Sequence, residues 1–161
     1  MSKYYLHLGS NLGNRKENLE SAIHKINELI GSTDSISSIY ETEPWGNSEQ
    51  NNFLNLAMIV ESQLVPKECM VACKEIENTI GPPKTEKWGP RYIDIDILYC
   101  DSMILKSDDL IIPHSSIYDR NFVLIPLMEI AGDFIDPIKN LSIEELYDLC
   151  LDKGEVFLYE E

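Results

Sequence analysis

Two hydrophobic periodicities alternate along the chain and together indicate a mixture of strands and helices. Apolar residues alternate with polar ones, or run without interruption, in short segments that we predict to be strands, at residues 4–8, 36–42, 53–63, 92–99 and 155–159. They recur at every third or fourth position in longer segments that predict helices, at residues 15–30, 66–80 and 123–131, with one more after Ser142. Polar stretches at residues 43–52 and 100–110 are expected to be a loop and a hairpin-like connection.

Side chains with known capping roles mark the ends of the first two predicted helices. Asn14, with Glu17 three residues later, is suited to cap the first helix, and Gly31 ends it. Pro66 suits the first turn of the second helix, which Gly81 closes. These helices are therefore bounded by signals that do not depend on the hydrophobic pattern.

The order of elements predicts the fold class. Ser142 and Glu145 form a capping box for the last helix, and Pro126 is expected in the first turn of the helix before it. The strands and the two long helices follow one another as β-α-β-β-α-β, the ferredoxin-like order. We expect one α+β domain over residues 1–161, layered α/β/α, with additional helices after this core.

Composition and charge exclude several classes of function. The 43% hydrophobic and 25% charged residues are ordinary for a globular protein, and the net charge of −15 argues against nucleic-acid or acidic-membrane binding. No run of eighteen apolar residues occurs, and Met1-Ser2-Lys3 leads directly into an apolar strand. Cys69 and Cys73, one helical turn apart, are expected to be thiols of the core, so we predict a cytoplasmic protein.

Two carboxylates lie on one face of the predicted strand over residues 92–99. Successive side chains of a strand point to opposite faces, so Asp94 and Asp96 share one face and the isoleucines between and beside them share the other. Oxygen ligands without a neighbouring His or Cys favour Mg²⁺ or Mn²⁺ over zinc. In so acidic a chain the pair alone is a weak signal, because two such aspartates arise by chance more often than as metal ligands.

Positive charge precedes these carboxylates. Lys84, Lys87 and Arg91 come just before the strand, together with the flat side chain of Trp88 and a Gly-Pro turn. Carboxylates for a divalent cation beside Lys and Arg suggest a bound polyphosphate. The alternative is a solvated run of surface cations.

The string WGPRYIDIDI, residues 88–97, resembles the characteristic motif of the 6-hydroxymethyl-7,8-dihydropterin pyrophosphokinase family of folate biosynthesis. Further similarity to this family extends from about residue 4 to residue 132. It includes the turn Gly9-Ser10-Asn11-Leu12-Gly13 and the pattern formed by Tyr40, Thr42, Pro44, Gly46, Phe53 and Asn55. It also includes the pattern formed by Pro113, His114, Arg120 and Phe122.

The resemblance implies transfer of pyrophosphate from ATP to the pterin, with two Mg²⁺ ions held by Asp94 and Asp96. It implies catalytic roles for Lys87, Arg91, Asp94 and Asp96. The ATP-binding residues it implies are Met70, Lys74, Glu77, Lys84, Lys87, Trp88, Arg91, Ile97, His114, Ser115 and Arg120. The pterin-binding residues it implies are Thr42, Pro44, Trp45, Phe53, Asn55, Trp88, Asp94 and Phe122. We expect a monomer that binds ATP and the pterin and that binds neither nucleic acid nor a membrane.

The chain departs from the family pattern after Gly81. The family has Arg at the first, third and sixth following positions, where this chain has Pro82, Lys84 and Lys87. Lysine keeps the charge but cannot form the planar two-point contact of Arg with phosphate.

Several of these residues also have a purely structural interpretation. The glycine-rich turn lacks the Lys-Ser/Thr of a P-loop and is better explained as a structural turn, and Trp45 can be a packing anchor. Asn55 can bind backbone groups, His114 can be structural, and the helix face formed by Met70, Lys74 and Glu77 can face solvent.

Two other classes of protein share part of the pattern. Nucleotide-sugar transferases hold Mn²⁺ with a D-x-D pair, but 161 residues is short for them and the W-G-P-R string is not part of their motif. Some ferredoxin-like domains bind RNA through basic and aromatic strand faces, which the charge of −15 disfavours.

Overall fold

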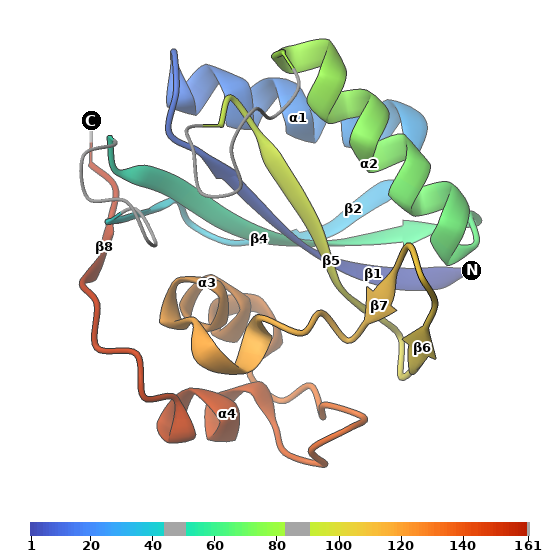
Figure 1. The fold of residues 1–161 in the computed structure, drawn as a ribbon, viewed down its shortest axis with the longest axis vertical. Coiled ribbons are helices and arrows are strands. Elements are labelled where there is room, and N and C mark those ends of the chain that lie inside the picture. The colour runs from blue at the N-terminus through green and yellow to red at the C-terminus, as the bar shows by residue number, and fades with distance from the viewer. Residues whose placement is uncertain (44–50, 83–90, 161) are drawn as a thin grey trace.

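The structure is a computed structural model that describes residues 1–43, 51–82 and 91–160. An antiparallel sheet with strand order β5-β1-β4-β3-β8 forms its centre, and β2 also pairs with β4 (Figure 1). Its strands are β1 (Ser2–Ser10), β2 (Ser32–Ile36), β3 (Tyr40–Thr42), β4 (Phe53–Ser62), β5 (Asp94–Cys100) and β8 (Val156–Leu158). A separate hairpin consists of β6 (Leu105–Lys106) and β7 (Ile111–Ile112).

Helices cover both faces of the sheet. The helices are α1 (Arg15–Leu29), α2 (Pro66–Ile80), α3 (Asn121–Ala131) and α4 (Ile143–Leu149), with a 3₁₀ turn at Ile117–Asp119. Figure 1 shows α1 and α2 on one face and α3 and α4 on the other. The layered α/β/α ferredoxin-like prediction is therefore confirmed.

Strand alternation divides the interior into two cores. Side chains such as Leu6, Leu8 and Ile95 pack between the sheet and α1 and α2, as the predicted isoleucine face of β5 requires. Leu98 and Tyr99 pack on the opposite face, against α3 and α4. Both residues can face the same way because an extra residue in β5 interrupts its register with β1 at this point.

The predicted strand over residues 36–42 is wrong, since two short strands occupy this region. β2 ends at Ile36 and β3 begins at Tyr40. Between them the Ser37 hydroxyl accepts a hydrogen bond from the Ala57 N–H at 2.9 Å and donates to the Ser38 carbonyl at 2.7 Å. The Ser37 N–H still donates to the Ala57 carbonyl at 2.9 Å, so the Ser37 side chain replaces one of the two backbone bonds of a regular pair, which the hydrophobic pattern cannot indicate.

The predicted start of α3 is also wrong, because the helix begins at Asn121 and not at residue 123. Pro126 consequently lies in the interior of the helix and not in its first turn. Other predicted ends are confirmed: the Asn14 side chain accepts from the Glu17 N–H, and the Ser142–Glu145 capping box is formed.

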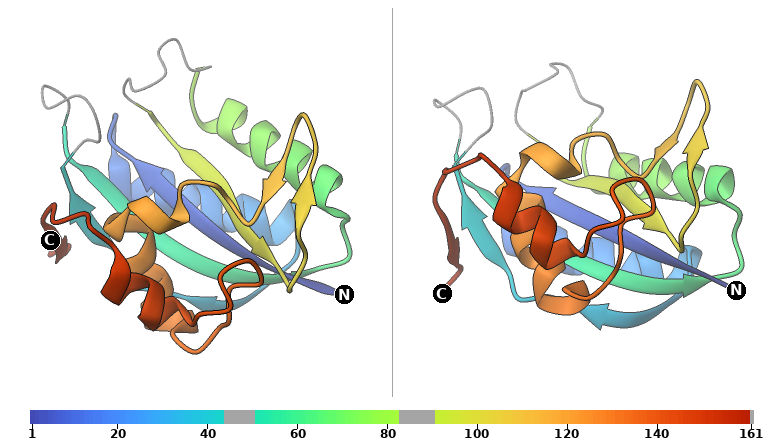
Figure 2. Two further views of the ribbon diagram at one scale, coloured as in Figure 1. Left: turned by 60° about the horizontal axis from the view of Figure 1, so that its bottom comes forward. Right: turned by 90° about the horizontal axis from the view of Figure 1, so that it is seen from below.

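The helices of the described residues are all too short or too polar to cross a membrane. The β6–β7 hairpin stands beside α2 (Figure 2), which places both next to the exposed face of β5 described below.

Candidate active site

Strand pairing brings the predicted site residues together across three strands. Gly9 on β1 pairs with Asn55 on β4 and with Asp94 on β5. Gly9 has no side chain, so its backbone forms a shallow surface between the Asn55 amide and the Asp94 carboxylate. We call this surface the floor of the site. A Cβ added to Gly9 would lie 3.3 Å from Asn55 Oδ1 and 3.4 Å from Phe53 Cδ1.

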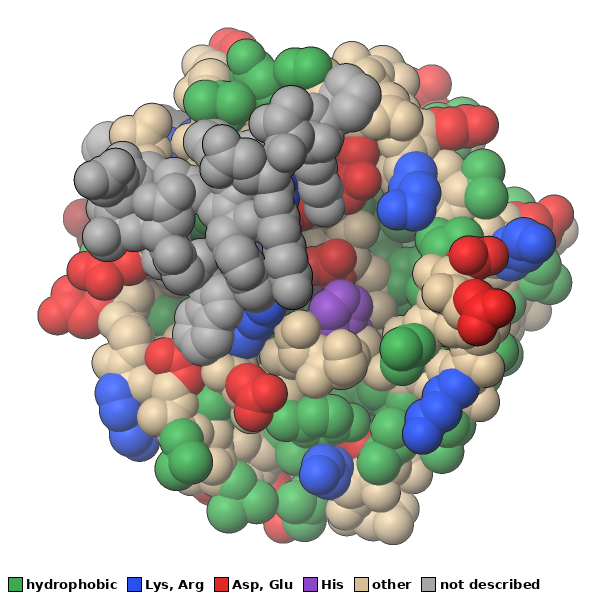
Figure 3. Space-filling view, viewed as in Figure 1, with side chains coloured by type: hydrophobic (Ala, Val, Ile, Leu, Met, Phe, Trp, Pro, Cys, Tyr) green, Lys and Arg blue, Asp and Glu red, His purple; other side chains and the backbone are tan. Residues whose placement is uncertain are grey.

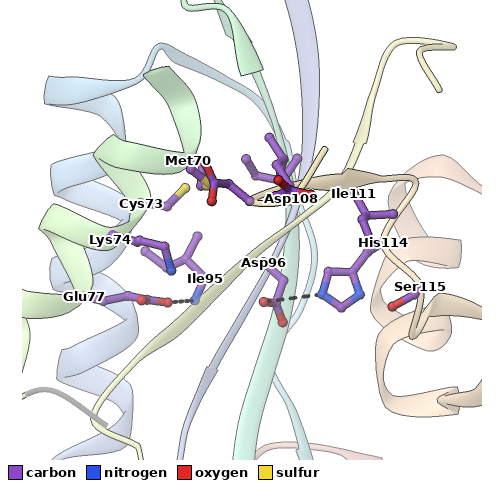
Figure 4. A pocket seen from close by; sticks show the side chains of 13 residues that line it. Met70, Cys73, Lys74, Glu77, Ile95, Asp96, Asp108, Ile111, His114 and Ser115 are labelled. Atoms are coloured by element: carbon purple, nitrogen blue, oxygen red, sulfur yellow. Dashed lines mark hydrogen bonds and ion pairs between the residues drawn. The ribbon is translucent and has the colours of Figure 1, made fainter. Parts of the chain in front are cut away.

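Asp94 and Asp96 lie on the same face of β5, as predicted, and both remain accessible. Their side chains are 27% and 39% exposed. Arg91 Nε lies 3.9 Å from Asp94 Oδ2, and His114 Nε2 lies 3.7 Å from Asp96 Oδ1 (Figure 4). Each carboxylate therefore has a cationic or potentially cationic neighbour at long ion-pair distance.

The turn after β1 positions Arg91. Asn11 Oδ1 accepts a hydrogen bond from the Arg91 N–H at 2.7 Å, and the Asn11 N–H donates to the Arg91 carbonyl at 3.0 Å. The other end of the same side chain, Nδ2, donates to the Asn51 carbonyl at 3.1 Å. The Gly9–Gly13 turn is thus a structural brace in this structure.

Arg120 brings a second guanidinium to the carboxylates. Burial lowers the pKa of Arg120, while Asp96, Asp119 and Asp94 oppose this shift. The guanidinium carbon lies 5.6 Å from the centre of the Phe122 ring. One segment therefore presents both a cation and an aromatic ring to the site.

A cavity of about 290 Å³ opens beside Asp96, between α2, β5 and the β6–β7 hairpin. The predicted residues that line it are Met70, Lys74, Glu77, Asp96, Ile97, His114 and Ser115. Glu77 Oε2 accepts a hydrogen bond from the Ile95 N–H at 2.8 Å, which fixes α2 against β5 (Figure 4). The Met70–Lys74–Glu77 face thus borders a cavity in addition to solvent.

Sequence reasoning did not identify other residues that line this cavity. They are Cys73, Ile95, Asp108, Asp109, Leu110 and Ile111. Cys73 was expected to be a core residue and Ile95 to lie on the face of β5 opposite the aspartates. Periodicity predicts burial, but it does not predict which cavity a buried side chain borders. The four hairpin residues, two acidic and two apolar, belong to no motif that would mark them as part of a site.

Residues predicted to bind a pterin gather on the other side of Gly9. Thr42 and Asn55 are buried, and Asn55 Nδ2 donates to Thr42 Oγ1 at 2.8 Å. The orientation of this amide directs Asn55 Oδ1 over Gly9. Phe53 pairs with Thr42 at the edge of the same floor.

Five predicted site residues lie outside the described residues: Pro44, Trp45, Lys84, Lys87 and Trp88. Their roles stay predictions.

On the face shown in Figure 3, the coloured acidic and basic side chains are interspersed, and a histidine lies beside acidic groups near the centre of the view.

The donor set suits a hard divalent cation. In the described part of the chain no group of three His, Cys, Asp or Glu side chains is poised to hold a metal. Asp94 and Asp96 alone would leave most coordination positions of Mg²⁺ to water and phosphate oxygens, which is how this ion is usually bound. The residues therefore fit Mg²⁺ presented together with a polyphosphate.

Comparison with known proteins identifies close relatives of the chain. Residues 5–132 match the family model of 7,8-dihydro-6-hydroxymethylpterin-pyrophosphokinase (HPPK). A pyrophosphokinase of Aquifex aeolicus, named for 2-amino-4-hydroxy-6-hydroxymethyldihydropteridine, is 37% identical over 145 residues, covering 90% of each chain. The protein of the same name from Bacillus subtilis is 40% identical over 128 residues, covering 79% of this chain and 77% of its own.

Larger proteins contain a similar region. The folic acid synthesis protein FOL1 of Dictyostelium discoideum is 40% identical over 144 residues, which are 88% of this chain and 22% of that protein. The crystal structure of Plasmodium falciparum HPPK-DHPS has a TM-score of 0.73 at 19% identity, covering 92% of this chain and 43% of that one. At this identity the structural match supports the fold alone.

Proposed function

We propose that the face of β5 that carries Asp94 and Asp96 is the place of catalysis, because the chain belongs to the 7,8-dihydro-6-hydroxymethylpterin-pyrophosphokinase family. Members of this family transfer pyrophosphate from ATP to 6-hydroxymethyl-7,8-dihydropterin in folate biosynthesis, and this chain does the same. The observation that carries the assignment is the row Asn55–Gly9–Asp94. It sets groups able to read a heterocycle directly beside a carboxylate able to hold a metal-bound polyphosphate.

The reaction itself defines what the residues must do. The pterin hydroxyl oxygen forms a bond to the β-phosphorus of ATP, the bond from that phosphorus to the α,β-bridging oxygen breaks, and AMP leaves with the bonding electrons. The hydroxyl proton passes to solvent. Such transfers depend mainly on alignment and on stabilising charge, so no strong general base is required.

Cationic side chains stabilise the charge on the phosphoryl oxygens. Arg91 and Arg120 are held near the carboxylates, and His114 lies at the edge of the cavity next to Asp96. Lys84 and Lys87 are assigned the same role from the sequence, with Lys87 and Arg91 at the transferred group.

Asp94 and Asp96 would hold Mg²⁺, and we assign two ions to them. Bound Mg²⁺ would neutralise the triphosphate and polarise the attacked phosphorus. The two aspartates contribute by being preorganised on one strand face, with Arg91 and His114 limiting the charge repulsion between them.

The two substrates occupy opposite sides of Asp94 and Asp96. The cavity bordered by Met70, Lys74, Glu77, Ile97 and Ser115 receives the nucleotide. Thr42 and Asn55 read the polar edges of the pterin, while Phe53 and Phe122 flank its faces together with Pro44, Trp45 and Trp88.

The whole chain is proposed to be one catalytic domain that acts as a monomer in the cytoplasm. Two cores that share one sheet support the single domain. The four cysteines Cys69, Cys73, Cys100 and Cys150 are buried and form no disulfide bond, an arrangement that suits a reducing compartment.

The test is the identity of the products. Purified protein with Mg²⁺, ATP and 6-hydroxymethyl-7,8-dihydropterin should form AMP and the pterin diphosphate in equal amounts, and no AMP without the pterin. ADP in place of AMP would indicate single-phosphoryl transfer. Turnover of a nucleotide sugar, or RNA binding with no AMP formed, would replace the assignment by one of the two other classes.

A further inference from the structure

Arg120 stands between two short segments that the chain after α3 holds in place. It follows the 3₁₀ turn Ile117–Asp119 and directly precedes α3, which begins at Asn121. The Arg120 carbonyl accepts hydrogen bonds from the N–H groups of Val123 at 3.1 Å and Leu124 at 3.2 Å, so its backbone is part of the first helical turn. The position of its guanidinium therefore depends on how the residues on either side are anchored.

On the side of the 3₁₀ turn, Tyr118 is bound to a buried carboxylate. The Tyr118 hydroxyl donates a hydrogen bond to Asp136 Oδ2 at 2.8 Å, and Asp136 is completely buried. The Tyr99 hydroxyl, on β5, donates to the same oxygen at 2.6 Å. The other oxygen, Oδ1, accepts from the N–H groups of Ile138 at 2.7 Å and Lys139 at 2.8 Å. One carboxylate with four donors thus joins the 3₁₀ turn to β5.

The burial of Asp136 makes this connection specific. A buried carboxylate is costly unless its oxygens are hydrogen-bonded, so the four donors and the carboxylate fix one another's positions. The Lys139 ammonium lies 5.1 Å from the centre of the Tyr118 ring, which adds a cation–π contact to the same tyrosine. An apolar residue in place of Asp136 could fill the same space, but it would not determine where the Tyr118 hydroxyl lies.

On the other side of Arg120, Asn121 is bound to the chain after α4. The Asn121 side chain donates from Nδ2 to the Gly154 carbonyl at 2.7 Å, and the Asn121 N–H donates to Asp152 Oδ2 at 3.2 Å. The Gly154 N–H donates to the second oxygen of Asp152, Oδ1, at 2.9 Å. The first N–H groups of a helix have no acceptor within the helix, so Asp152 supplies one from another segment.

We propose that Asp136 and Asp152 are positioning residues for Arg120. Asp136 acts through Tyr118, and Asp152 acts through Asn121. Together they fix the backbone on both sides of Arg120, so that its guanidinium is aligned with the phosphoryl oxygens before ATP binds. The inference rests on the proposed role of Arg120 in stabilising charge during the transfer. Both aspartates follow residue 132, where the match to the family model ends, so the C-terminal part of the chain supports a site whose sequence motifs all lie before it.

The first test removes only the Tyr118 hydroxyl. Tyr118→Phe should lower kcat about fivefold or more, because a small displacement of the guanidinium weakens its contact with the transferred group. The KM for the pterin should stay within about twofold, since an interaction made mainly in the transition state affects kcat and not KM. Rates of AMP formation over a range of pterin concentrations give both constants.

A double-variant cycle shows whether this effect passes through Arg120. Arg120→Ala alone should lower kcat about a hundredfold. In the Arg120→Ala background, Tyr118→Phe should lower kcat by less than about twofold further, because the group that it positions is gone. Asp152→Ala gives a second, independent route: it should lower kcat in the otherwise unmodified protein and have little effect in the Arg120→Ala background.

Two controls separate positioning from a general loss of stability. Tyr147→Phe removes the hydroxyl of an exposed tyrosine on α4 and should change no kinetic constant. Gly31→Ala places a Cβ against the backbone of β4, away from α3, so it should lower stability and leave kcat unchanged below its unfolding midpoint. Thermal unfolding of every variant identifies the temperature at which all are folded.

Three results would overturn the proposal. They are an unchanged kcat in Tyr118→Phe, a fivefold loss that persists in full in the Arg120→Ala background, and a normal kcat in Arg120→Ala itself. Absence of AMP formation by the unmodified protein would instead overturn the proposed function, before any variant is compared.

Discussion

At the scale of single residues, the site depends on side chains kept accessible beside buried ones. Asp94 and Asp96 alternate with Ile93, Ile95 and Ile97, whose burial fixes which way the strand faces. Because the hydrophobic face of β5 determines the direction of the carboxylates, the metal-binding assignment and the core packing are inseparable.

Asp94→Asn and Asp96→Asn should each reduce turnover by about a hundredfold or more, since each removes a carboxylate that we propose as a Mg²⁺ ligand. Both variants should fold normally, because removing one of two neighbouring carboxylates relieves charge repulsion. The check is AMP production at saturating Mg²⁺ together with thermal unfolding. Near-normal turnover in both variants would refute the metal assignment.

At the scale of elements, the short strands β2 and β3 are fastened to α3 by a polar contact. The carboxylate of Glu129 on α3 accepts from the Ser38 N–H at 3.0 Å and from the Tyr40 hydroxyl at 2.6 Å. Periodicity predicted the long elements well, as at residues 66–80, but not this joint. This contact joins side chains that are far apart in the sequence, so a local hydrophobic pattern cannot predict it. The early start of α3 likewise depends on contacts with residues far away in the sequence.

The hydrogen bond between Tyr40 and Glu129 should make the free energy of unfolding fall as the pH becomes alkaline. Burial and then Glu129 raise the pKa of Tyr40 to about 12 from its usual 10.0. The unfolded chain therefore loses this proton first, so the contribution to stability is complete below pH 10 and disappears between pH 10 and 12. Tyr40→Phe should make the urea midpoint fall less steeply with pH over that interval. Identical slopes for both proteins would contradict this.

Position 31, at the junction after α1, should tolerate no residue other than glycine. A Cβ on Gly31 would lie 2.0 Å from the backbone oxygen of Glu61, which belongs to β4 and has little freedom to move. Gly31→Ala should therefore lower the free energy of unfolding by about 2 kcal/mol or more.

Gly132→Ala is the matched control for that substitution. Its added Cβ approaches the end of the flexible Glu144 side chain most closely, at 2.8 Å, so its cost should be much smaller. Urea denaturation of both variants gives the comparison, and equal midpoints would show that the α1 junction can adjust.

At the scale of the whole molecule, the active site depends on sheet register more than on any single motif. The sequence motifs indicated the metal, phosphate and pterin residues, and the alternation of β5 indicated which face carries the carboxylates. The pairing of Gly9 with both Asn55 and Asp94 could not be foreseen, because register depends on how the complete sheet packs. For the same reason the cavity residues contributed by the β6–β7 hairpin were missed.

The shared row of the sheet predicts that the two substrates bind cooperatively. In the proposed function Asp94 borders the pterin floor and also holds the metal that accompanies the nucleotide, so filling one side should favour the other. A Mg²⁺-bound, non-hydrolysable ATP analogue should tighten pterin binding by about fivefold or more, and the pterin should tighten analogue binding by the same factor. Calorimetry in both orders tests this. Removing Mg²⁺ with a chelator should abolish the effect, and tightening that persists without metal would contradict it.

The brace at Asn11 has a consequence for spectroscopy. One side chain joins Arg91, at the start of the segment leading into β5, to Asn51, at the start of the segment leading into β4. The amide proton of Arg91 points at Asn11 Oδ1, so its exchange with deuterium requires that brace to open. Because one brace serves both segments, a ligand that steadies either of them should slow the exchange of this proton. A single amide resonance therefore offers a reporter for both halves of the active site, read without turnover.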